Sequence, residues 1–167
     1  IGVYRSIGIL TTIFTCTLIL VFSGILYVIE RSREVFRQNE ESKRLLLQAA
    51  GDGIFGVDAM GRVTFINPAA LRMLGFSEEE VLSQDIHSLI HYSYEDGTEY
   101  PIEQCPVYAS CTYATVSDFV EGEVLWRKDG SSFPVEYSSM PITKDGNVIG
   151  AVVSFKDVTD RKRSEEL

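Results

Sequence analysis

Two histidines and one cysteine are the residues of this sequence whose types and spacing could hold a metal ion or a cofactor. His87 and His91 are four residues apart, so on a helix both side chains project from one face. With Cys105 they would offer nitrogen and sulfur ligands for zinc, and a single histidine could bind haem iron. The alternative is a pair of solvated or hydrogen-bonded helix histidines. We predict His87 and His91 as candidate cofactor-binding residues and expect no metal site, because the spacing is not a zinc signature.

The cysteines give little sign of reactivity. Glu103 and an acidic loop surround Cys105 in the sequence, which disfavours a thiolate and a redox switch. Cys111 follows Cys105 by too many residues for a tight zinc knuckle. In a reducing cytoplasm these two cysteines are not expected to form a disulfide.

Catalytic motifs are missing from the sequence. It has no glycine-rich phosphate loop, no histidine in a phosphoacceptor helix and no convincing Ser/His/Asp or carboxylate pair. Residues 51–167 carry nine basic and twenty acidic side chains, a net charge of −11, which phosphates would repel. We therefore expect neither an enzyme nor a nucleic-acid-binding protein in this chain.

The N-terminal part differs in composition from the rest. Residues 6–29 carry no charge, and as a helix they would be long enough to cross a bilayer. A cleaved signal peptide has a shorter apolar stretch. Only Arg5 precedes the stretch, whereas five basic residues follow it by position 44, which predicts a cytoplasmic C-terminal side. The sequence thus predicts a single-pass transmembrane helix in the inner (cell) membrane, and the start at Ile1 leads us to expect a longer parent protein.

Residues 30–46 are rich in helix formers and predict a cytoplasmic linker helix. A weak, polar seam follows coiled-coil spacing, and Asn39 at a core position could set the register of a parallel homodimer. A solvated linker helix explains the same residues. The seam consists of Val28, Ser32, Val35, Asn39, Ser42, Leu46 and Ala49.

The remaining residues predict an α+β domain with a five-stranded antiparallel sheet and short helices on one face. Asn67 and Pro68 predict a helix start directly after a strand, since asparagine caps well and proline suits the first helical position. Asp-Gly pairs between alternating runs predict hairpins. The expected strands are 54–58, 62–66, 119–128, 132–140 and 148–155, and Asp85 is expected to cap a short helix from Ile86 to His91.

Three segments in this order resemble the PAS family of sensory domains. They are "DGIFGVDAMGRVTFINPAALRMLGFSEEEVLSQ", "WRKDGSSFPVEYSSMPI" and "GAVVSFKDVTDRKR". The resemblance implies a PAS fold over residues 47–158 and an input module of a histidine kinase or diguanylate cyclase, with a C-terminal output domain in the parent chain. It leaves haem or flavin open as cofactors, although the sequence requires neither. The Asn-Cys-Arg-Phe motif of light-sensing relatives is absent.

Several strand residues allow two interpretations. Their side chains could line a ligand pocket, but apolar strand faces are more often plain core, which we favour. These residues are Trp126, Phe133, Tyr137, Val153 and Phe155, and Arg127 and Lys128 beside them are expected to be solvated hairpin charges.

The end of the chain predicts an exit helix over residues 159–167. Asp157 is placed to bond backbone N–H groups at its start or to pair with a nearby base, and Thr159 can cap it. We predict Asp157 and Thr159 as signal-coupling residues of a membrane-bound two-component sensor. The alternative function is a ligand-free PAS module that only holds two chains together.

Overall fold

The computed structural model describes the backbone of residues 2–165. Within that range, the side chains of residues 2–17, 19, 43, 44 and 48 are outside the description. The chain divides into two units, Ile1–Leu46 and Leu47–Leu167, and each is described by itself.

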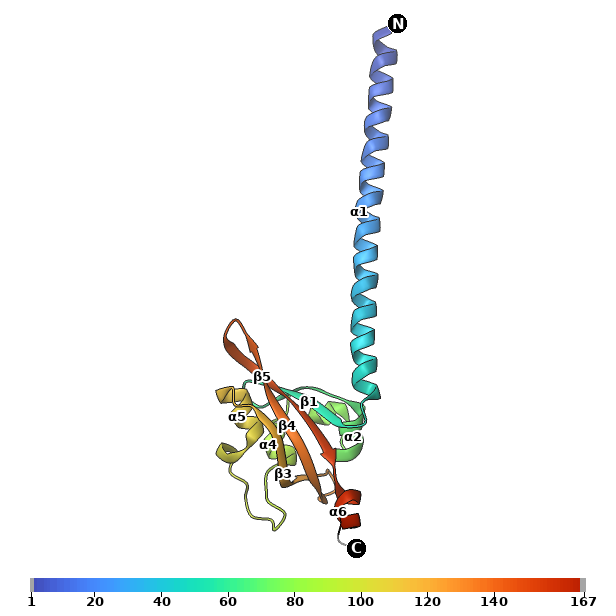
Figure 1. Cartoon of the computed structure of the whole chain (residues 1–167). Coiled ribbons are helices and arrows are strands. Elements are labelled where there is room, and N and C mark those ends of the chain that lie inside the picture. Colours follow the sequence, from blue (N-terminus) through green and yellow to red (C-terminus); the bar gives the residue numbers. More distant parts are fainter. Residues whose placement is uncertain (1, 166–167) are drawn as a thin grey trace. The chain divides into compact units, whose positions relative to one another are not determined.

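The first unit is formed by helix α1, Gly2–Ala49 (Figure 1). Among the residues that the structure describes, no helix is both long and apolar enough to cross a membrane. Within the uncharged stretch of residues 6–29, the structure describes the side chains of Leu18 and of residues 20–29. The charged part of the helix begins with Glu30. About 20 apolar residues are needed to span a bilayer. The predicted single-pass location in the inner membrane is therefore wrong, and residues 6–17 of the predicted span lie outside the described side chains.

The second unit contains one antiparallel sheet with the strand order β2-β1-β5-β4-β3. The predicted fold class is confirmed, and β5 is the central strand. Strands β4 and β5 are longer than expected because their hairpin stays paired almost to the turn, as in the pairing of Lys144 with Asn147. Strand β3 has the expected length but begins and ends two residues earlier. The strands are β1 Gly53–Asp58, β2 Val63–Ile66, β3 Ser117–Trp126, β4 Ser132–Lys144 and β5 Asn147–Asp157.

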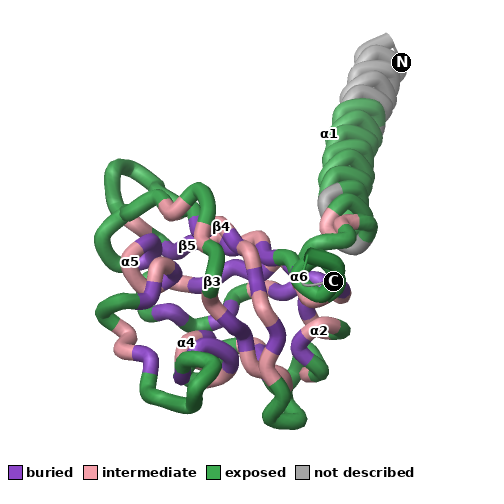
Figure 2. The backbone as a smooth tube through the Cα atoms, turned by 60° about the horizontal axis from the view of Figure 1, so that its bottom comes forward, coloured by how far each residue is buried: buried purple, intermediate pink, exposed green. Residues whose placement is uncertain are grey.

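Short helices lie between β2 and β3 in the sequence and cover one face of the sheet (Figure 1). Figure 2 shows buried backbone where these helices meet the sheet. The core there is built from apolar side chains of both layers, among them Phe55, Phe155 and Ile90, each at most 2% exposed. The helices are α2 Pro68–Leu74, α3 Glu78–Val81, α4 Ile86–Ile90, the 3₁₀ helix η1 Ile102–Gln104 and α5 Pro106–Tyr113, and α6 Thr159–Glu165 follows β5.

Asn67 explains why a strand can run straight into a helix. Its Oδ1 accepts hydrogen bonds from the backbone N–H of Ala70, at 2.9 Å, and of Ile54 on β1, at 3.0 Å. Its amide nitrogen donates to the carbonyls of Leu47 and Asp52. One buried side chain thus caps α2 and fastens it to β1 and to the chain before β1.

Candidate functional site

Helix α4 brings the two predicted histidines to one face. Asp85 caps this helix, and its Oδ1 accepts from the backbone N–H of His87 at 3.2 Å. His87 lies in the first turn and His91 directly follows the last residue, so the two rings are neighbours with centroids 5.9 Å apart. His91 is buried and His87 is half-buried. Of the alternative, solvated or hydrogen-bonded histidines, the solvated form does not describe this geometry, whereas the hydrogen-bonded form describes His87, whose Nε2 lies 3.0 Å from a backbone carbonyl.

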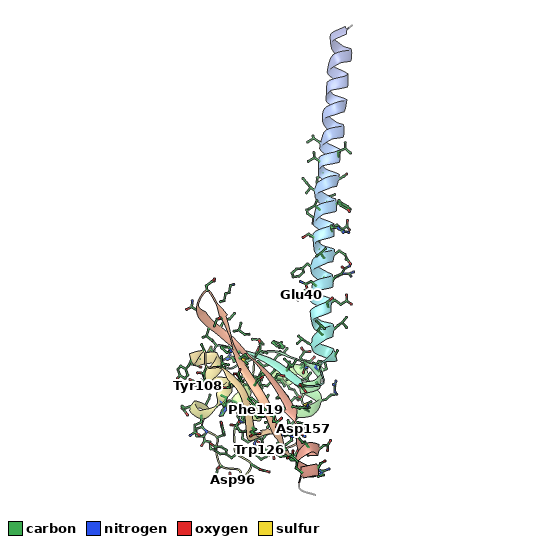
Figure 3. All side chains as sticks on the ribbon, in the orientation of Figure 1. Glu40, Asp96, Tyr108, Phe119, Trp126 and Asp157 are labelled. Atoms are coloured by element: carbon green, nitrogen blue, oxygen red, sulfur yellow. The ribbon has the colours of Figure 1, made fainter. Side chains whose placement is uncertain are left out.

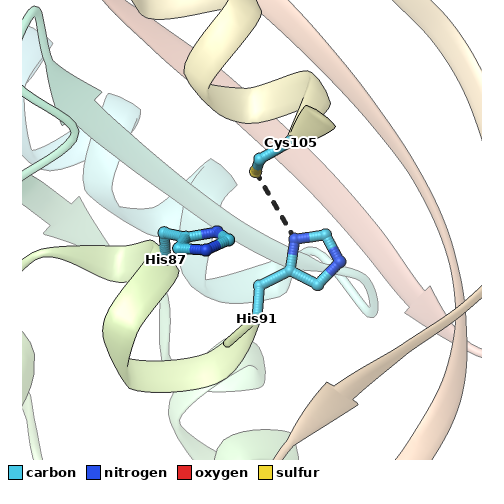
Figure 4. A group of neighbouring side chains, drawn as sticks. All are labelled: His87, His91 and Cys105. Carbon is cyan, nitrogen blue, oxygen red and sulfur yellow. Dashed lines mark hydrogen bonds between the residues drawn. The ribbon is translucent and has the colours of Figure 1, made fainter. Parts of the chain in front are cut away.

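Cys105 completes a three-residue cluster with the histidines (Figure 4). It lies between η1 and α5 and is 1% exposed. Its Sγ is 3.5 Å from Nδ1 of His91. One ligand atom from each of the three residues lies within 4.8 Å of the other two. Cys111, the sixth residue of α5, is also buried and free but is not part of this cluster.

The outer nitrogen of each imidazole has an oxygen partner. Nε2 of His87 is 3.0 Å from the carbonyl oxygen of Tyr100. Nε2 of His91 is 3.0 Å from Oε2 of Glu123 on β3. Glu123 also accepts hydrogen bonds from the hydroxyls of Tyr100, at 2.9 Å, and Tyr137, at 2.7 Å. These contacts orient both rings so that their Nδ1 edges are left for other partners.

The charges of the cluster support each other. Burial opposes the thiolate, but the neighbouring imidazoles of His87 and His91 outweigh it and lower the pKa of Cys105 to about 6. Burial likewise opposes the imidazolium, but hydrogen bonds to Cys105 and Glu123 raise the pKa of His91 to about 9. The prediction that the surroundings of Cys105 disfavour a thiolate is wrong. It weighed Glu103, which is near in sequence, and missed the histidines, which are near in space.

A small cavity adjoins the cluster. Its volume of about 20 Å³ suits one water molecule or ion and is far below the roughly 300–1,000 Å³ of small-molecule sites. Haem and flavin therefore do not fit here without rearrangement of the core. Three of the five strand residues considered above line it, so they are core and cavity wall at once. The cavity is lined by Phe55, Ile86, His87, Ile90, His91, Cys105, Val107, Leu125, Tyr137, Val153 and Phe155.

A second group of polar contacts lies where β5 passes into α6, at Asp157 (Figure 3). Oδ1 of Asp157 accepts from the backbone N–H of Thr159 at 2.9 Å and from the Thr159 hydroxyl. Oδ2 accepts from Nη2 of Arg127 at 2.9 Å. Asp157 is thus the residue that caps α6, and Thr159 is the first residue of that helix and a donor to the cap.

Arg127 is not the solvated hairpin charge that the sequence predicts. It is half-buried, and its guanidinium carbon lies 4.1 Å from the centre of the Phe133 ring. Its Nη1 donates to the carbonyl of Met73 in α2 at 3.1 Å. Arg127 therefore joins α2 to the start of α6 through Asp157. The signal for this role is a base one residue after a strand, which many solvated hairpins share, so sequence reasoning missed it.

The sheet order and the helices on one face are those of a sensory α+β domain. The family model described as "PAS fold" matches residues 41–158. The chain belongs to the PAS family. Among solved structures, the PAS domain of an HTR-like protein from Haloarcula marismortui is similar with a TM-score of 0.59 at 19% identity, covering 77% of this chain and 98% of that one.

Curated relatives are larger signalling proteins of Escherichia coli (strain K12). The probable diguanylate cyclase DgcE is 28% identical over 136 residues, which are 81% of this chain and 12% of that protein. The signal transduction histidine-protein kinase AtoS is 28% identical over 132 residues, 79% of this chain and 20% of that protein. This chain therefore spans at most a fifth of the length of these two relatives.

Proposed function

We propose that this chain is a sensory PAS module that passes a conformational signal through Asp157 and α6 to an output domain of a larger parent protein. PAS domains are sensory and non-catalytic modules. The relatives combine such a region with kinase or diguanylate cyclase activity according to their names. A sensor histidine kinase or a diguanylate cyclase is thus the parent protein that we propose.

The observation that carries the proposal is the carboxylate of Asp157. One of its oxygens holds the first turn of α6 and the other holds Arg127, which in turn contacts α2. A movement of α2 can therefore change the start of α6. A cap contributes about 1 kcal/mol, which is small beside a domain stability of about 5–15 kcal/mol but significant for a two-state switch with a gap of a few kcal/mol.

The test is the output activity of the full-length parent carrying Asp157→Ala. Asp118→Ala is the matched control, because it removes an exposed carboxylate from β3. We expect the thermal melts of both variants to stay near that of the wild type, and only Asp157→Ala to change output. Unchanged output in a folded Asp157→Ala protein would refute the relay role. If Asp157→Ala unfolds, the isosteric Asp157→Asn variant answers the same question.

A ligand-free dimerisation module is the alternative function. The small volume of the cavity favours it, as do the exposed apolar side chains of Val35 and Leu46 on α1. In that case two chains would pair as a homodimer through the predicted seam. Light scattering of wild type and Asn39→Leu, combined with the output assay, separates the two functions. If the chain is a structural module, Asn39→Leu should change the oligomeric state, whereas Asp157→Ala should leave output unchanged.

A further inference from the structure

The orientation of both imidazoles is that of histidines prepared for a metal ion. Histidine ligands of metals commonly donate their outer N–H to a carboxylate or a backbone carbonyl, which fixes the tautomer and the ring plane. Nε2 of His87 has the Tyr100 carbonyl within hydrogen-bond distance, and Nε2 of His91 has the Glu123 carboxylate at 3.0 Å as an ion-pair contact. In the neutral tautomers with Nε2 protonated, the lone pairs are on Nδ1, and a metal ion at His91 would displace the Nδ1 proton that the imidazolium carries in the metal-free chain.

Nδ1 of His91 faces Cys105, and Nδ1 is also the nitrogen of His87 that is left for the cluster, because its Nε2 lies at the Tyr100 carbonyl. Nδ1 of His87 is buried and has no hydrogen-bond partner in the described part of the chain. A buried polar atom without a partner is costly and calls for an explanation. Nδ1 of His91 has the sulfur of Cys105 as its neighbour, at 3.5 Å.

The distances are close to those of a tetrahedral zinc site. With Zn–S near 2.3 Å and Zn–N near 2.0–2.1 Å, the edge between a nitrogen and a sulfur ligand is about 3.5 Å. The Cys105–His91 distance equals this value. The largest separation within the cluster, 4.8 Å, needs a contraction of about 1 Å, which a rotation of a side chain provides.

We propose that Nδ1 of His87, Nδ1 of His91 and Sγ of Cys105 bind one Zn²⁺ ion. Two imidazoles and one thiolate form a borderline-soft set, which suits zinc better than magnesium or calcium. Three protein ligands leave a fourth position, and the adjoining cavity of about 20 Å³ can hold a water molecule there. Glu123 is a positioning residue that acts through His91. This inference does not depend on the relay role of Asp157.

The spacing of the three residues in the sequence is not that of a zinc finger, and for this reason no metal site was predicted. The third ligand comes fourteen residues after His91, from the segment between η1 and α5. Only the packing of that segment against α4 brings the sulfur to the histidines.

The test measures zinc binding to the whole 167-residue chain. Wild type, Cys105→Ser, His91→Gln, Glu123→Gln and Cys111→Ser are freed of metal with a chelator, incubated with Zn²⁺, dialysed and analysed for zinc by mass spectrometry. Titration with Zn²⁺ against a competing chelator gives the affinity of each protein. Cys111→Ser is the matched control, because it removes a buried cysteine outside the cluster. We expect about one equivalent in wild type and Cys111→Ser, and a loss of at least about tenfold in affinity in Cys105→Ser, His91→Gln and the positioning variant Glu123→Gln.

Wild type without zinc, or equal zinc in Cys105→Ser and Cys111→Ser, would overturn the proposal. Circular dichroism shows whether each variant is folded. If Cys105→Ser does not fold, Co²⁺ bound to wild type and Cys111→Ser decides: a thiolate-to-cobalt charge-transfer band in both supports the site, and no such band in wild type overturns it.

Discussion

Arg127 and Asp157 form a half-buried ion pair of 2.9 Å, and each of them also binds a helix. Arg127 donates to a carbonyl of α2, and Asp157 accepts from the first N–H of α6. The pair therefore connects α2 with α6, the helix that follows the last strand of the sheet.

Arg127→Lys is expected to weaken this connection although it keeps the charge. Lysine cannot reproduce the planar fork that contacts Asp157 and Met73 and covers the Phe133 ring. We expect the free energy of unfolding in urea to fall by about 1–2 kcal/mol. Lys128→Ala is the control, because Lys128 pairs with Glu80 on the exposed surface and should leave stability nearly unchanged. Equal stabilities of Arg127→Lys and wild type would contradict the role given to the guanidinium.

Asn67→Ala is expected to cost more than the loss of an ordinary helix cap. The substitution removes the cap of α2 and also leaves the N–H of Ile54 and the carbonyls of Leu47 and Asp52 without this partner. We expect a loss of about 2–3 kcal/mol in urea unfolding. Asp85→Ala, which removes the cap of α4, should cost about 1 kcal/mol. A smaller effect for Asn67→Ala than for Asp85→Ala would show that Asn67 is only a local cap.

The pH dependence of stability should reveal the protonated state of His91 in the chain kept free of metal with a chelator. Burial alone would lower the pKa of His91, but its bonds to Cys105 and Glu123 raise it to about 9, whereas an unfolded histidine titrates near 6.5. Taken by itself, the raised pKa of His91 gives a stabilisation that is complete below about pH 6.5 and is lost as the pH rises through about 9. The pKa of Cys105, lowered to about 6, has the opposite pH dependence, so between about pH 6.5 and 8.5 the pair binds as many protons in the folded as in the unfolded chain, and the two contributions offset each other.

Thermal melts of wild type and His91→Gln between about pH 6.5 and 10 check this expectation. Because His91→Gln also removes the partner that lowers the pKa of Cys105, the difference in Tm should stay nearly constant between about pH 6.5 and 8.5 and should shrink above about pH 9, where His91 loses its proton. Asp118→Ala should follow the wild type throughout. A difference that grows with pH would mean that His91 is neutral in the folded chain.

The sheet and its helices could be predicted because each depends on local signals. Asn67 and Pro68 mark the start of α2, and the Asp-Gly pair at 129–130 marks the turn between β3 and β4. Helix periodicity also placed His87 and His91 on one face of α4.

The rest of the site could not be predicted, because it depends on contacts between distant segments. Glu123 lies on β3, thirty-two residues after His91, and nothing in its own neighbourhood marks it as a histidine partner. Arg127 meets Asp157 across the sheet in the same way. The membrane span predicted from the uncharged N-terminal stretch was wrong, because among the described residues no helix is both long and apolar enough to cross a membrane.

Hydrogen–deuterium exchange at the start of α6 tests most directly whether Asp157 controls the exit helix. The amides of Thr159 and Lys162 report on the first turn, because they donate to Asp157 and to the carbonyl of Val158. Loss of a cap worth about 1 kcal/mol should make these amides exchange about fivefold faster in Asp157→Ala than in Asp118→Ala, while the amides of β5 keep their protection. Equal exchange at α6 in the two variants would contradict the account.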